Sequence, residues 1–130
     1  MKTLIEITLN DILNSQQALQ EIAGMNMRAK TAFKIARIVH AIESELESFN
    51  KARQNLLKKY GEKDSDGKLV INEEGNYIII PDKIDYYNNE IKELLTTNIQ
   101  LNIEPIELNE LEQLEFTPTF AYQIEKYIKK

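Results

Sequence analysis

Residues 27–60 have the sequence MRAKTAFKIARIVHAIESELESFNKARQNLLKKY and set the architecture of the chain. Apolar residues recur there at alternating spacings of four and three, which is the heptad pattern of a helix that packs along one seam. Neither proline nor glycine occurs in this stretch, so we expect one continuous helix of about 50 Å that ends at Gly61. The seam consists of Ile35, Val39, Ile42, Leu46, Phe49, Leu56 and Tyr60, with Arg53 as its one polar interruption.

This helix is too long to be covered by the rest of a compact chain, whose radius of gyration should be about 14 Å. A second helix predicted at 82–96 spans only about 21 Å, so we expect the remainder of the seam to contact a second copy, most simply in a twofold dimer, or a larger homo-oligomer. Arg53 then either pairs with a carboxylate or an anionic ligand at the interface, or lies on the surface. The predicted interface residues are Ile35, Val39, Ile42, Leu46, Phe49, Arg53 and Leu56.

Shorter elements flank the long helix on both sides. Alternating apolar residues predict strands at 3–8 and 99–103, and β-rich runs at 68–71 and 76–80 predict a hairpin. Asn10 or Asp11 can cap one short helix, Ser15 can cap a second, and Thr117-Pro118 begins the last helix. The chain is therefore predicted to be α+β, a single domain of residues 1–130 with a long helical hairpin and a small, mainly antiparallel sheet.

Composition excludes several classes of function. The 130 residues include no cysteine and one histidine, His40, which we interpret as a flank residue of the long helix. The four glycines stand far apart, so no phosphate-binding glycine loop is present. We therefore expect no enzyme, no catalytic residue, no cofactor and no metal site.

The net charge of −5 argues against binding to long nucleic acids. Nothing approaches the roughly 20 consecutive apolar residues of a membrane-spanning helix. We expect a cytosolic protein that does not bind membranes.

One basic cluster stands out at the start of the long helix, formed by Arg28, Lys30, Lys34 and Arg37. Arginine suits bidentate contact with phosphate and lysine supplies a point charge. We predict that this cluster binds a small anionic, phosphate-bearing ligand or an acidic surface of a host protein, the alternative being a solvated helix face.

Two acidic segments have structural interpretations. The loop Glu62–Glu73 matches part of the EF-hand calcium pattern, with Asp64, Asp66 and Gly67 in register, but the segment after it contains Gly75 and reads as a strand. We favour an acidic turn that leads into a hairpin. The carboxylates of residues 104–115 are expected to be solvated or paired with the basic cluster, and they are Glu104, Glu107, Glu110, Glu112 and Glu115.

Several segments resemble a group of small proteins encoded by tailed phages and prophages of Gram-positive bacteria. They are AKTAFKIAR at 29–37, RQNLLKKYGEKDSDG at 53–67, ELL at 93–95 and IQLNIEPI at 99–106. The resemblance covers most of the chain, carries no catalytic signature and transfers no functional residue. It implies a phage origin and action in the host cytosol during infection.

These expectations converge on a non-catalytic, phage-encoded binding protein that captures a small anionic signal or a host protein stoichiometrically. Immune evasion is one role of that kind. The alternative is an oligomeric structural or assembly factor of the virion that uses the long helix as its interface.

Overall fold

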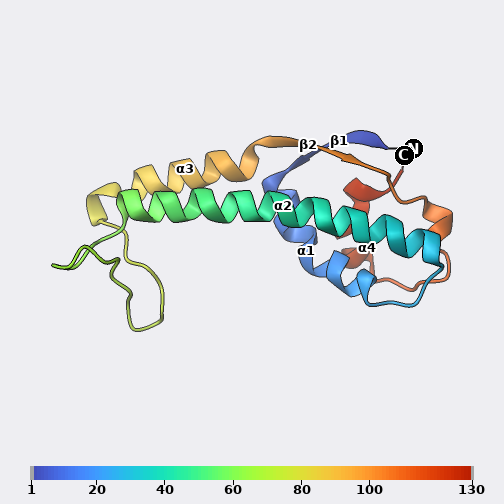
Figure 1. Cartoon of the computed structure of the whole chain (residues 1–130), viewed down its shortest axis with the longest axis horizontal. Coiled ribbons are helices and arrows are strands. Elements are labelled where there is room, and N and C mark those ends of the chain that lie inside the picture. The colour runs from blue at the N-terminus through green and yellow to red at the C-terminus, as the bar shows by residue number, and fades with distance from the viewer. Residues whose placement is uncertain (1, 130) are drawn as a thin grey trace. The chain divides into compact units, whose positions relative to one another are not determined.

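The computed structural model describes residues 2–129 and combines helices with a small antiparallel sheet (Figure 1). The chain is 60% helical, and the prediction of an α+β fold with one long helix is confirmed. The principal elements are β1 (Thr3–Thr8), α1 (Leu9–Ala23), α2 (Ala29–Tyr60), α3 (Ile84–Thr96), β2 (Asn98–Ile103) and α4 (Pro118–Ile124). Short 3-10 turns are η1 (Pro81–Lys83), η2 (Leu108–Leu111) and η3 (Glu125–Tyr127).

Contacts divide the chain into two compact units. Unit 1 comprises Met1–Leu46 and Thr97–Lys130, and unit 2 comprises Glu47–Thr96. Helix α2 passes from the first unit into the second without a break. The single domain expected for residues 1–130 stays a prediction, because the contacts separate two units and yet both units contain part of this helix.

Strand β1 pairs with β2 in an antiparallel register that places Thr3 opposite Ile103 and Thr8 opposite Asn98. Both strands lie where the alternating pattern predicted them. Their inward-facing side chains are buried in unit 1 because alternate residues of a strand point to the same face. These buried residues are Ile7, Leu101 and Ile103.

The start of α1 differs from the prediction. Thr8 is the N-cap, and its hydroxyl accepts a hydrogen bond of 3.1 Å from the backbone N–H of Asp11. The Asp11 carboxylate accepts one from the Thr8 N–H in return, which completes a capping box. Ser15 caps no separate turn, since it is buried inside the single helix and its hydroxyl hydrogen-bonds the Ile12 carbonyl oxygen.

The arm of residues 61–80 does not form the predicted hairpin strands. Only isolated bridges occur there, such as Lys63 with Leu69 and Ile71 with Tyr77. Two matching turns reverse the chain on either side of residues 68–71. Asp64 Oδ1 accepts the N–H groups of residues 66 and 68, and Asn72 Oδ1 accepts those of 74 and 76.

The hydrophobic core lies almost entirely in unit 1. Among the described residues, sixteen of the seventeen buried apolar side chains belong to unit 1, and Leu57 alone belongs to unit 2. Ile35, Ile42 and Leu46 are buried by the chain itself. These three residues of the predicted interface are therefore core residues and are not available to a second copy.

The remaining residues of the predicted interface are more accessible. Val39, Phe49 and Leu56 are half-buried, and Arg53 is exposed. The surface interpretation of Arg53 therefore holds within the single chain. Within residues 2–129, no helix combines the length and apolar character required to cross a membrane.

Candidate functional site

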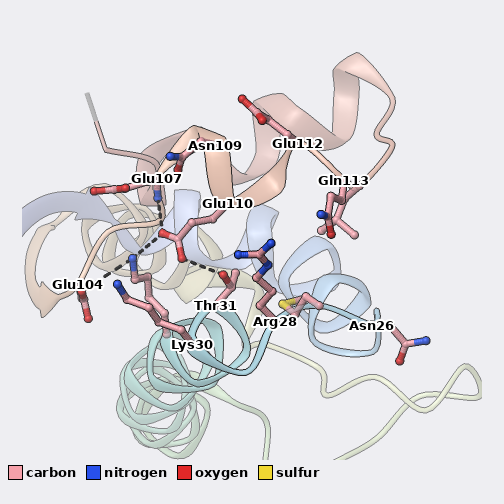
Figure 2. A pocket seen from close by; sticks show the side chains of 13 residues that line it. Asn26, Arg28, Lys30, Thr31, Glu104, Glu107, Asn109, Glu110, Glu112 and Gln113 are labelled. Atoms are coloured by element: carbon pink, nitrogen blue, oxygen red, sulfur yellow. Dashed lines mark hydrogen bonds and ion pairs between the residues drawn. The ribbon is translucent and has the colours of Figure 1, made fainter.

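A cavity of about 480 Å³ opens in unit 1 between the start of α2 and the segment 104–114 (Figure 2). We call it the charged cavity, because basic side chains of α2 face carboxylates across it. Its basic side chains are Arg28, Lys30 and Lys34, and its carboxylates are Glu104, Glu107, Glu110 and Glu112. The structure thus brings three of the four predicted basic residues together with four of the five acidic ones.

Lys34 and Glu110 form the central interaction of this cavity. The Lys34 Nζ donates a hydrogen bond of 2.5 Å to Glu110 Oε1 and lies 3.8 Å from Glu104 Oε1. The Thr31 hydroxyl donates a 2.8 Å hydrogen bond to the other oxygen of Glu110. Figure 2 shows Glu110 pointing toward Thr31. Lys34 is only 6% exposed, so it serves the structure and is not free to bind a ligand.

The local sequence of η2 holds Glu110 in place. Glu107 is the N-cap of this turn, and its backbone N–H donates a 3.0 Å hydrogen bond to Glu110 Oε1. Burial raises the pKa of the Glu110 carboxyl, but the hydrogen bonds from Lys34, Glu107 and Thr31 outweigh burial. The net pKa lies below its ordinary value, and Glu110 stays ionised at neutral pH.

Arg28 and Lys30 are the accessible cations of the charged cavity. Both side chains are exposed: Arg28 directly precedes α2, and Lys30 lies in its first turn, which contains no acidic residue. The first N–H groups of a helix have no partner within the helix and carry partial positive charge. This end of the cavity is therefore electropositive, although the opposite wall carries Glu107 and Glu112.

Arg37 lies apart from the other three basic residues. It lines a second cavity of about 440 Å³ in unit 1 together with Lys2, Phe33 and His40. The predicted cluster of four is therefore divided between two cavities. Phe33 is 66% exposed beside Arg37, so this second cavity joins an apolar ring to basic side chains.

Sequence patterns did not indicate the polar, uncharged residues of the charged cavity. Asn26, Asn109 and Gln113 line it, and Thr31 holds Glu110. No sequence motif indicates the three amide side chains. The spacing of Glu107 and Glu110, however, is that of a capping box and predicts the turn that these two residues form.

The structure also shows what the carboxylates of the two acidic segments contact. Glu110 pairs with the basic helix end, as one of the two structural interpretations expected. Asp64 is engaged by backbone N–H groups in its turn. Across residues 2–129, no three His, Cys, Asp or Glu side chains come together as a metal site requires.

Comparison with known proteins places the chain in a family. Residues 3–117 match the family described as "Protein of unknown function (DUF1617)". The chain belongs to this family. No curated protein and no solved structure matches it significantly. The match spans both units and includes Arg28, Lys34 and Glu110, so the charged cavity lies inside the region that defines the family.

Proposed function

We propose that this protein is a non-catalytic binding protein that captures a small phosphate-bearing ligand in the charged cavity. The observation that carries the proposal is the position of Arg28 and Lys30, both exposed at the N-terminal end of α2, one just before the helix and one in its first turn. Helix N-termini with adjacent cations are favourable sites for phosphate, because backbone N–H groups and the helix dipole both attract anions. The cavity volume is within the range of small-molecule sites.

The opposite wall restricts the kind of ligand. Glu107 and Glu112 would repel a ligand that carries negative charge at both ends. Carboxylates and the amides of Asn109 and Gln113 accept hydrogen bonds from hydroxyl and amino groups. A phosphate ester with hydrogen-bond donors at its far end, such as a nucleotide, fits this wall better than inorganic phosphate does.

The states of the charged residues favour binding over catalysis. Glu110 is ionised and held by Lys34, so it has no proton to donate as a general acid near neutral pH. Lys34 is buried in the same pair and is not placed as a nucleophile. We further propose that the protein is phage-encoded, as its resemblances imply, and acts in the host cytosol, with immune evasion as one role.

Calorimetric titration tests this function directly. The full chain is titrated with inorganic phosphate and with a panel of nucleoside mono-, di- and cyclic phosphates. We expect saturable binding of at least one nucleotide, and a loss of roughly tenfold or more in affinity for Arg28→Glu and Lys30→Glu. Arg37→Glu is the matched control, since it makes the same charge change on the same helix but lines the other cavity.

Two results would count against the proposal. If Arg37→Glu weakens binding as much as Arg28→Glu does, the effect is one of overall charge. If no phosphate ester binds but a host protein is retained through Arg28, the captured partner is the acidic protein surface instead. Native mass spectrometry of protein purified from infected cells distinguishes these, because a nucleotide adds a small mass and a protein adds a large one.

A structural or assembly role in the virion is the second candidate. It is favoured by the apolar side chains exposed in unit 2, among them Ile71, Tyr77 and Tyr86. Such a factor would form a large ring or polymer, which native mass spectrometry detects in the same measurement.

A further inference from the structure

Unit 2 lacks a hydrophobic core of its own. Across its span of Glu47–Thr96, Leu57 is the one buried large apolar side chain, and α3 has no buried residue. A unit of this size normally needs further burial, a metal or a partner chain to be stable. We therefore expect the apolar surface that unit 2 leaves uncovered to bind a partner.

Two helices form this surface. The end of α2 and the helix α3 are joined by stacked rings of Tyr60 and Tyr86, with centroids 6.5 Å apart, and by the ion pair of Lys59 with Glu90. Figure 1 shows α3 alongside this part of α2. Each helix also carries apolar side chains that the single chain covers only in part. These half-buried side chains are Phe49, Leu56, Ile91, Leu94 and Leu95.

The two helices carry opposite charge. The α2 segment 47–60 has the cations Lys51, Arg53, Lys58 and Lys59 against the single carboxylate of Glu47. Helix α3 has Asp85, Glu90 and Glu93 against Lys92. A second copy turned by a twofold axis would set α2 of one chain against α3 of the other, with attraction at both contacts.

Two charged residues of this surface are incompletely paired among residues 2–129. Glu90 Oε2 is buried yet has no hydrogen-bond partner among residues 2–129. Arg53 is exposed, has no ion-pair partner in the same part of the chain, and interrupts the heptad seam. Lys59 Nζ lies 4.0 Å from the other oxygen, Oε1, and the Glu90 side chain is 38% exposed, so an arginine of a second copy can approach the carboxylate group and add charge-assisted hydrogen bonds.

We propose that unit 2 binds a second copy of this chain as a closed twofold dimer in which Arg53 of each copy pairs with Glu90 of the other. The half-buried apolar stripes of α2 and α3 form the centre of the interface, and the two symmetric ion pairs select the register. This inference is independent of ligand capture in unit 1.

Sedimentation equilibrium of the full chain, from about 1 to about 200 µM, tests the dimer. We expect a mass near twice 15.1 kDa at the higher concentrations. A strict monomer throughout, or a polymer of increasing mass, would overturn the proposal.

Two single variants test the pairing. Arg53→Glu and Glu90→Arg each place like charges together at both contacts, and each should raise the dimer Kd roughly tenfold or more. An equimolar mixture of the two variants should restore dimerisation, because both contacts in the mixed dimer again join opposite charges. An ion pair within one chain cannot be repaired by mixing.

Folding is monitored by circular dichroism, and Lys51→Glu is the control for a charge change elsewhere on α2. If Glu90→Arg does not fold, Glu90→Gln replaces it, and the mixed dimer should still be favoured over either homodimer. A wild-type dimer that the variants leave unweakened, or a mixture no better than the single variants, would refute the pairing of Arg53 with Glu90.

Discussion

Lys34 Nζ lies 2.5 Å from Glu110 Oε1, and this ion pair joins α2 to the turn η2, 76 residues further along the chain. Both side chains are largely shielded, with exposed fractions of 6% and 14%. Removal of one partner leaves the other charge buried without compensation. The basic cluster therefore contains one residue that serves stability and at least two that are free for binding.

Lys34→Met should lower the free energy of unfolding by about 3 kcal/mol, because Glu110 would stay buried without its counter-charge. Urea denaturation measures the change. Lys30→Met is the matched control on the same helix, and because Lys30 is exposed it should change stability by less than about 0.5 kcal/mol. Equal stability of Lys34→Met and the wild type would show that the pair is not structural.

The stability contributed by Glu110 should depend on pH in the acid range. Its pKa in the folded chain lies below the ordinary value of 4.5, so the ionised carboxylate stabilises the fold. This contribution is complete above pH 4.5 and is lost as the pH falls through the lower, folded pKa. The difference in unfolding free energy between wild type and Glu110→Gln should therefore narrow as the solution is acidified. A constant difference down to about pH 3 would contradict this assignment.

Tyr127 should titrate above the ordinary pKa of 10.0 for a tyrosine. Burial raises its pKa to about 12, although the hydrogen bond with Ser15, 2.7 Å between the two hydroxyl oxygens, partly opposes the rise. The folded state keeps this proton longer than the unfolded state, so stability is present below pH 10 and declines as the pH rises toward 12. Ultraviolet absorbance of phenolate should show one late step that disappears in Tyr127→Phe.

The same substitution should cost about 1 kcal/mol at neutral pH, since it removes one buried hydrogen bond. Tyr122→Phe is its control, because Tyr122 is 77% exposed. If both variants have the same melting temperature, the hydroxyl of Tyr127 contributes nothing measurable.

Gly61→Ala should destabilise the end of α2 by about 2 kcal/mol. A methyl group there would lie 2.4 Å from the Leu57 carbonyl oxygen and 2.7 Å from Leu69 Cδ2. Gly24→Ala meets nothing closer than 3.5 Å and should be close to neutral. Differential scanning calorimetry compares the two, and an unchanged melting temperature for Gly61→Ala would mean that the arm moves aside without cost.

Local patterns were enough to predict the regular elements. The heptad spacing of residues 35–60 predicted α2, alternation predicted β1 and β2, and Thr117 with Pro118 predicted the start of α4. Each of these signals acts within a few residues, where backbone geometry alone decides which side chains share a face. The arm at 61–80 was predicted as a hairpin because its β-rich composition is also a local signal, but pairing joins residues beyond the turns, and only isolated bridges form there.

Which side chains are buried, and which residues pair with each other, could be decided only from the tertiary structure. Lys34 and Arg37 are one helical turn apart and equally basic in sequence, yet Lys34 is buried against Glu110 and Arg37 lies at another cavity. The heptad seam is likewise uniform in sequence, but Ile35 and Ile42 are buried in the core, whereas Phe49 and Leu56 stay half-covered. Sequence periodicity shows that a face is apolar, and only the packing of distant segments decides what covers it, because those contacts join residues far apart along the chain.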